Sequence, residues 1–263
     1  MNFNAVIFDM DGVVTKTAAV HAAAWKRMFD EYLRGLAATD HEVFREFTHD
    51  DYLAFVDGRP RYAGVRTFLS ARGISLPYGD PSDPQEVETI CGLGNRKNWF
   101  FHKVLEEDGV EVYDSTIQLI HQLRTRRVKV GLATSSKNAT VVLEKARIAD
   151  LFETCVDGIV SAELGLRGKP QPDIFLAACR NLKVHPSRSV VVEDAVSGVE
   201  AGARGHFGLV IGVARENNAE ALRRSGADLV LTDLAETSLQ AIDDWFLHGT
   251  RTHSTPLVTV RTL

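Results

Sequence analysis

Two carboxylates follow a short apolar run near the start of the chain. The run is Ala5–Phe8, and Asp9 and Asp11 come directly after it, with Gly12 next. A short uninterrupted apolar run is typical of a strand buried on both faces of a parallel sheet. Such sheets bind ligands at the carboxyl ends of their strands. Asp9 and Asp11 are therefore candidates for catalysis, although two aspartates that only cap the next helix would give the same pattern.

Three more polar clusters follow apolar runs or stiff loops. A second carboxylate pair, Glu193 and Asp194, follows the apolar run 190–192. Lys169 lies in a loop stiffened by Pro170 and Pro172, which favours a fixed ammonium near phosphate over an ordinary solvated lysine. A hydroxyl-rich turn after the run 128–133 suits a phosphate, but it also fits a plain helix N-cap. That turn consists of Thr134, Ser135, Ser136, Lys137 and Asn138. Carboxylates and a backbone carbonyl are ligands that Mg²⁺ prefers.

The elements that must position these side chains alternate along most of the chain. Apolar runs predict strands at 5–8, 128–133, 190–192, 209–213 and 229–231. Helical patterns precede or separate the last four, at 115–126, 138–146, 173–181, 196–204 and 219–225. This alternation predicts a Rossmann-like α/β fold, a parallel sheet with helices on both faces.

The segment 17–106 shows no buried-strand pattern. Its helical runs cover 17–36, pieces of 41–55, 65–71 and 95–106, and the Pro- and Gly-rich stretch 73–84 is predicted to be a loop. We therefore expect a small all-helical cap domain at 17–106, inserted after the first strand of a core made of 1–16 and 107–248. The tail, 249–263, has no clear period, so a peripheral strand and a loose end both stay open.

Composition excludes several classes of protein. The chain has 263 residues and a formal charge of −5, with no basic stripe for nucleic acid. Cys91, Cys155 and Cys179 form no CxxC pair, which argues against a zinc site or a disulfide framework and for free thiols in a reducing compartment. No apolar stretch is long enough for a membrane span, so a cytoplasmic protein is expected.

Taken in the order in which they occur along the chain, the four polar clusters described above resemble the four motifs of the haloacid dehalogenase superfamily of phosphoryl-transfer enzymes. The segments 169–175 and 192–198 are especially similar. The resemblance implies that Asp9 is the nucleophile, that Asp11 is the general acid and base, and that Lys169 offsets charge on the transferring group. It also implies a Mg²⁺ cofactor, with the metal set Asp9, Asp11, Glu193 and Asp194.

The inserted segment resembles the cap of the β-phosphoglucomutase-like family within this superfamily. The resemblance rests on residues 8–17, on His21, Trp25 and Lys26, on Gly58-Arg59-Pro60-Arg61, and on Arg96-Lys97-Asn98. It implies that Arg61 holds the distal phosphate of the substrate and that His21 lies near the acid/base. The substrate-binding set that we predict is His21, Trp25, Gly58, Arg59, Arg61, Lys97, Thr134, Ser135, Ser136, Lys137, Asn138 and Lys169. Lys16, where the family usually has Asp, and the inserted region 73–94 depart from the pattern.

The family implies a reaction class and leaves alternatives open. The leading expectation is interconversion of β-glucose 1-phosphate and glucose 6-phosphate through an aspartyl phosphate and a 1,6-bisphosphate. A capped sugar-phosphate phosphatase is the alternative. A catalytically idle binding module is a third class, which would be expected to lack a core carboxylate or the loop lysine, and both are present. The expected partner is a small sugar phosphate, with no nucleic acid or membrane, and the expected state is a monomer or weak dimer.

Overall fold

The computed structural model describes residues 1–40, 43–215 and 217–248, so the predicted tail lies outside the described residues. Six parallel strands form one sheet in the order β3-β2-β1-β4-β5-β6. They are β1 (Ala5–Phe8), β2 (Lys129–Ala133), β3 (Thr154–Val156), β4 (Ser189–Glu193), β5 (Leu209–Val213) and β6 (Leu229–Leu231). Because β1 pairs with both β2 and β4, the carboxyl ends of these three strands meet at one edge of the sheet.

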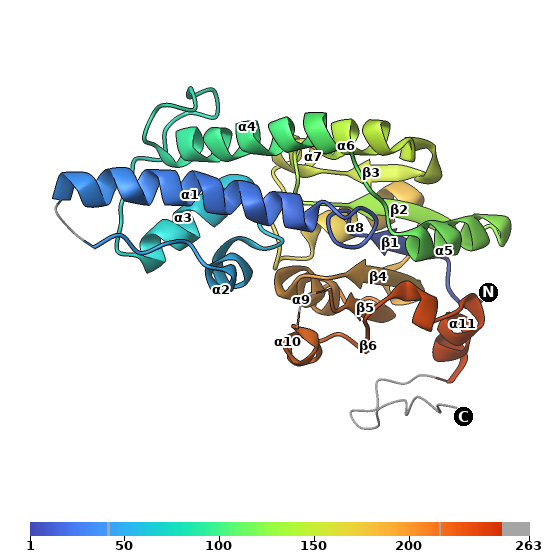
Figure 1. Ribbon diagram of the computed structural model, residues 1–263. Helices are drawn as coiled ribbons and strands as arrows, with labels where there is room; N and C mark the ends of the chain where they lie inside the picture. Colours follow the sequence, from blue (N-terminus) through green and yellow to red (C-terminus); the bar gives the residue numbers. More distant parts are fainter. Residues whose placement is uncertain (41–42, 216, 249–263) are drawn as a thin grey trace, which may run out of the picture.

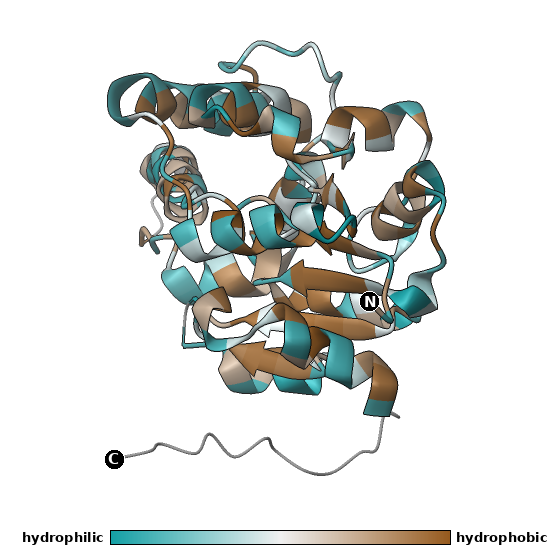
Figure 2. Cartoon of the chain, turned by 90° about the vertical axis from the view of Figure 1, so that its right-hand side faces the viewer, coloured by the Kyte–Doolittle hydropathy of each residue, from teal (hydrophilic) through white to brown (hydrophobic). Residues whose placement is uncertain are grey.

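Helices cover both faces of the sheet, which confirms the predicted α/β class. Alternate residues of β1 enter two separate cores, Val6 and Phe8 on one face and Ala5 and Ile7 on the other. The first core is covered by α5 (Asp114–Thr125), α6 (Ala139–Ala146) and α11 (Leu239–His248). The second is covered by α8 (Asp173–Leu182), α9 (Val196–Arg204) and α10 (Ala219–Arg224). Figure 2 shows the hydrophobic strands lying between helices whose outer faces are hydrophilic.

Four helices and a π-helical turn lie between β1 and α5 in the described part of the chain. These inserted helices are α1 (Ala18–Asp40), α2 (His49–Asp51), η1 (Tyr52–Val56), α3 (Arg61–Ala71) and α4 (Ile90–Asp108). Phe29, Phe47 and Phe68 pack together at their centre, with ring centroids 4.2 to 4.9 Å apart. Figure 1 shows α1, α3 and α4 extending beyond the carboxyl ends of the strands. The inserted helices therefore stand over the edge of the sheet where Asp9 lies.

Several elements differ from the sequence prediction. The three-residue strand β3, the short helix α7 (Gly158–Glu163) and α11 were not predicted, nor were the 3₁₀ turns η2 (Ala149–Leu151), η3 (Pro186–Arg188) and η4 (Leu234–Glu236). Strand β3 lies at the edge of the sheet, where Thr154 and Cys155 are only half-buried and form no apolar run. Helix α4 begins at Ile90 because Thr89 caps it by accepting from the Gly92 amide.

The predictions on the cysteines, on membrane-spanning helices and on the loop 73–84 can be compared with the described residues. Cys91, Cys155 and Cys179 are free thiols, as predicted. Over the parts of the chain that the structure describes, no helix combines the length and apolar character needed to cross a membrane. The predicted loop 73–84 contains no helix or strand.

Candidate active site

Asp9 and the carboxylate pair Glu193 and Asp194 lie far apart in the sequence but come together at the carboxyl end of β1. The Lys169 ammonium lies 2.5 Å from Asp9 Oδ1 and 2.5 Å from Glu193 Oε1, and its side chain is 1 % exposed. Ligand oxygens of Asp9, Glu193 and Asp194 lie within 4.8 Å of one another. Three convergent carboxylates are a hard oxygen donor set, which fits a cation such as Mg²⁺.

Burial sets the protonation of this cluster. Burial, reinforced by Glu193 and Asp11, raises the pKa of Asp9 despite the attraction of Lys169. The pKa of Asp194 is also raised, by burial and then by Asp57, Glu193 and Asp9. Burial opposes the charge of Lys169, but Asp9 and Glu193 outweigh it and raise the pKa of the ammonium. The cluster therefore has an excess of negative charge, which a divalent cation would offset.

Glu193 supports the cluster through both of its oxygens. Oε1 accepts from Lys169, and Oε2 accepts from the backbone amides of Asp194 and Ala195 at 2.8 and 2.9 Å. Two glycines make room for the carboxylates. A Cβ on Gly12, which has φ of +89°, would lie 1.7 Å from Asp194 Oδ2, and one on Gly198 would lie 1.7 Å from Glu193 Oε1.

Asp11 lies beside a chain of polar groups from the inserted helices. Thr17 donates a hydrogen bond to Asp11 Oδ1, and His21 Nε2 lies 3.3 Å from the same oxygen without hydrogen-bond alignment. His21 Nδ1 is hydrogen-bonded to the ammonium of buried Lys97. Burial opposes ionisation of Asp11, yet His21, Thr17 and Lys97 together lower its pKa. Burial and the Arg61 charge lower the pKa of Lys97 well below its usual value.

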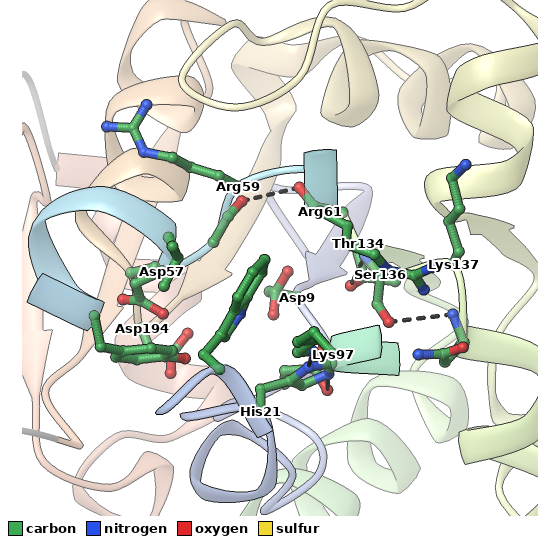
Figure 3. Close-up of a pocket in the computed structure, with 18 of the residues that line it drawn as sticks. Asp9, His21, Asp57, Arg59, Arg61, Lys97, Thr134, Ser136, Lys137 and Asp194 are labelled. Atoms are coloured by element: carbon green, nitrogen blue, oxygen red, sulfur yellow. Dashed lines mark hydrogen bonds and ion pairs between the residues drawn. The ribbon is translucent and has the colours of Figure 1, made fainter. Parts of the chain in front are cut away.

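Aromatic rings hold this chain in place. His21 stacks on Phe101 with centroids 4.0 Å apart, and the Lys97 ammonium lies 4.9 Å from the Phe101 ring and 5.1 Å from the Trp25 ring. Trp25 is itself buried and lines the cleft. His21, Trp25 and Lys97 therefore lie together in one corner of the cleft, and Figure 3 shows His21 and Lys97 side by side. Of these three residues, only His21 was predicted to lie near Asp11.

The hydroxyl-rich turn forms the opposite wall. Thr134 Oγ1 accepts from the Ser136 amide at 3.1 Å, and Ser136 Oγ accepts from the Asn138 amide at 3.2 Å, so both hydroxyls shape the turn. Ser135 instead donates to the carbonyl of Gly58, which lies in the turn before α3. Arg61 donates to Asn98 Oδ1 at 2.7 Å, and the side-chain amide of Asn138 donates to the same oxygen at 2.8 Å.

Two predicted substrate-binding side chains are directed away from Asp9. Figure 3 shows the Arg59 guanidinium and the Lys137 ammonium both pointing outward. The Lys137 ammonium lies 4.9 Å from the Tyr62 ring. Both residues nevertheless line the cleft. The cleft also contains Asp9, Asp11, His21, Trp25, Gly58, Arg61, Lys97, Thr134, Ser135, Ser136, Asn138, Glu193 and Asp194.

Four residues near the cleft were not predicted as site residues. Tyr52 and Asp57 line it from η1 and the turn that follows. Ser197 donates to the Asp57 carbonyl at 3.2 Å, and Asn98 joins Arg61 to Asn138. Asn98 and Ser197 had a signal in the sequence, since Asn98 follows Lys97 directly in the segment 96–98 and Ser197 lies in the segment 192–198, both already singled out.

Comparison with known proteins agrees with this geometry. The haloacid dehalogenase-like hydrolase family matches residues 3–206. A β-phosphoglucomutase of Mycobacterium tuberculosis is 44 % identical over 88 % of this chain and 90 % of its own length. A phosphorylated carbohydrates phosphatase of Thermotoga maritima is 30 % identical over 85 % of this chain and 91 % of its own. The crystal structure of a β-phosphoglucomutase from Clostridium difficile shares the fold, with a TM-score of 0.74 and 23 % identity over 93 % of this chain and 97 % of its own.

Proposed function

The chain belongs to the haloacid dehalogenase-like hydrolase family, and we propose that it interconverts β-D-glucose 1-phosphate and glucose 6-phosphate. The observation that carries the proposal is the pairing of a phosphoryl-transfer cluster on the sheet with Arg61 from the inserted helices in the same cleft. The 44 % identity to a β-phosphoglucomutase over most of both chains supports the same reaction.

Asp9 is the proposed nucleophile. A carboxylate oxygen of Asp9 attacks phosphorus, the bond from phosphorus to the sugar oxygen breaks, and an aspartyl phosphate forms. The aspartyl phosphate gives this phosphoryl group to the free hydroxyl of a sugar monophosphate, which forms the 1,6-bisphosphate. Attack of Asp9 on the other phosphorus of the bisphosphate then breaks that phosphorus–oxygen bond, releases the isomerised monophosphate and regenerates the aspartyl phosphate. Lys169, 2.5 Å from Asp9, can offset the charge on the transferring group.

Asp11 is the proposed general acid and base. It would give a proton to the departing sugar oxygen and later remove one from the incoming hydroxyl, a contribution of about 10²- to 10⁴-fold. In the present arrangement Thr17 and His21 stabilise its ionised form, which suits the step that removes a proton. For the opposite step Asp11 must exchange these partners for the substrate oxygen, so Thr17 and His21 would help to set its proton affinity.

Mg²⁺ is the proposed cofactor. Asp9, Asp194 and the Asp11 carbonyl would hold it, with Glu193 fixing the loop beside them. When bound, the ion would keep Asp9 ionised and neutralise charge on the phosphoryl group. Burial and the neighbouring carboxylates raise the pKa values of Asp9 and Asp194 despite Lys169, and a bound cation would favour the ionised forms of both.

The inserted helices are proposed to act as a cap, with residues 17–106 moving against 1–16 and 107–248. A mutase must protect its aspartyl phosphate from water until a sugar hydroxyl arrives, and a closed cap does this. Arg61 supplies a second phosphate site, which a bisphosphate intermediate needs and a monophosphate phosphatase does not.

One incubation tests the proposal. Purified protein is supplied with β-glucose 1-phosphate, Mg²⁺ and a trace of β-glucose 1,6-bisphosphate, and glucose 6-phosphate and inorganic phosphate are both measured. We expect glucose 6-phosphate to accumulate with little free phosphate. Stoichiometric release of glucose and phosphate would instead establish the phosphatase alternative.

A further inference from the structure

Asn98 occupies an unusual position between the two sides of the cleft. It lies on α4, one residue after Lys97, and its Oδ1 accepts from Arg61 at 2.7 Å and from Asn138 at 2.8 Å. Arg61 begins α3 of the inserted helices, whereas Asn138 precedes α6 on the sheet side. One amide oxygen therefore links donors from both parts of the molecule.

The network determines which atom of each amide faces the other. A guanidinium can only donate hydrogen bonds, so the Asn98 atom that meets Arg61 must be the oxygen. Since that oxygen also meets the amide of Asn138, Asn138 must present its nitrogen. Both lone pairs of the Asn98 oxygen are then used, and both donors are directed at one point.

A phosphate is the kind of group that the remaining N–H donors of Arg61 and Asn138 would bind while Asn98 stays in place, because a guanidinium has five N–H groups and an amide has two. It accepts from guanidinium and amide donors and binds them more strongly because it is charged. Arg61 is partly buried and Asn138 is buried, so neither donor can be left without an acceptor at low cost. The amide oxygen of Asn98 thus satisfies one N–H group of each residue and holds their other N–H groups in place for a ligand.

We propose that Asn98 is a positioning residue that aims Arg61 and Asn138 at the second phosphate of a sugar bisphosphate. This inference rests on the proposed function, because only a bisphosphate brings a second phosphate into the cleft. Without Asn98 the long Arg61 side chain must be ordered when the ligand binds, and affinity should fall about ten- to a hundredfold.

The test uses the full chain with Asp9→Asn, which cannot transfer phosphate, as the background. Binding of β-glucose 1,6-bisphosphate in Mg²⁺ is measured by calorimetry with and without Asn98→Ala. Asn95→Ala is the matched control. It also lies on α4, but its amide nitrogen donates to the carbonyls of Pro81 and Asp83 at 3.1 and 2.9 Å, and its oxygen accepts from the Tyr62 hydroxyl at 3.0 Å instead of from Arg61 and Asn138.

We expect Asn98→Ala to raise the Kd about ten- to a hundredfold and Asn95→Ala to change it less than threefold, although both can lower the melting temperature. Asn98→Asp keeps the acceptor but puts a competing charge beside Arg61, so its stability should recover while bisphosphate binding stays weak. Equal Kd values for Asn98→Ala and Asn95→Ala would overturn the inference. Absence of bisphosphate binding by the Asp9→Asn background itself would instead overturn the proposed function.

Discussion

The Ser135 hydroxyl donates a hydrogen bond of 2.9 Å to the carbonyl of Gly58, joining the sheet to the inserted helices. On the other side of the same turn, Ser197 donates to the Asp57 carbonyl at 3.2 Å. Gly58 fits this narrow space because it has no side chain: a Cβ there would lie 2.5 Å from Ser197 Oγ. Two serines from different loops therefore hold one turn of the inserted segment against the sheet.

Removing both serine contacts should favour the open form of the cleft. Each neutral hydrogen bond contributes about 0.5–1.5 kcal/mol, so Ser135→Ala with Ser197→Ala should raise the ratio of phosphate release to isomerisation about tenfold. Parallel assays of inorganic phosphate and glucose 6-phosphate measure this ratio. Ser70→Ala, at an exposed position on α3, is the control. An unchanged ratio would show that these contacts do not govern closure.

Asp9→Asn should abolish turnover while preserving the fold. Loss of the nucleophile is expected to reduce kcat by about 10⁴-fold or more. Because burial raises the pKa of Asp9, its ionised form is disfavoured in the folded protein, and the neutral amide should melt at the same temperature or higher. Coupled assays and thermal denaturation test the two statements. Residual turnover near that of the unaltered protein would remove Asp9 from the mechanism.

Replacing Arg61 should affect KM far more than replacing Arg59, although the two residues are only two positions apart. Arg61 is directed at the Asn98 and Asn138 side of the cleft, whereas the Arg59 guanidinium points outward. Arg61→Ala should raise KM for β-glucose 1-phosphate about 10- to 100-fold, since a charged hydrogen bond contributes about 1.5–3 kcal/mol. Arg59→Ala should change KM less than threefold. Similar losses in steady-state assays of both variants would mean that Arg59 turns inward when substrate binds.

Lys97→Met should stabilise the protein and impair catalysis. The buried ammonium has a lowered pKa, so the unfolded chain binds a proton more readily than the folded one, and stability should rise with pH from the folded pKa of Lys97 to about 10.5. The Met variant should lack this pH dependence, and its free energy of unfolding at neutral pH should be higher by on the order of 1 kcal/mol. Its kcat should be about tenfold lower. Urea denaturation at several alkaline pH values compares the slopes, and parallel slopes would contradict the assignment.

Gly198→Ala should displace Glu193 and with it Lys169. The added Cβ would overlap the Glu193 carboxylate, so we expect a loss of about 2 kcal/mol or more in unfolding free energy and a lower kcat. Gly35→Ala is the matched control on α1, where a Cβ would meet no atom within 4 Å. There alanine should stabilise the helix by up to about 1 kcal/mol. Denaturant titration of both variants measures the difference, and a Gly198 variant as stable as the Gly35 variant would refute the packing argument.

The parts of the fold that follow from apolar runs could be predicted from the sequence. The bounds of β1, β5 and β6 agree with the prediction because each is an uninterrupted run of non-polar residues. Strand β3 has only three residues and begins with a threonine, so it shows no such run. Helix α4 begins earlier than predicted because Thr89 caps it and the region 77–89 is bonded to its first turns.

The types of the polar residues and their order in the sequence predicted where the site lies. They did not predict the direction in which each side chain points. Glu193 was predicted among metal ligands, yet its oxygens also bond Lys169 and two backbone amides, an arrangement that depends on the turn after β4. Arg59 and Lys137 match the family pattern, but their charged ends turn outward. The link through Asn98 depends on contacts between separate elements, which no local pattern reveals.

The position of β1 in the sheet bears on how the protein is made on the ribosome. The strand that carries Asp9 is translated first, yet its neighbours β2 and β4 come after the inserted helices, and Lys169 lies 160 residues beyond Asp9. A nascent chain that has not reached Lys169 holds an aspartate with no ammonium partner, and one that has not reached β4 leaves one edge of β1 unpaired. The catalytic cluster is therefore complete only late in translation, when β4 pairs with β1.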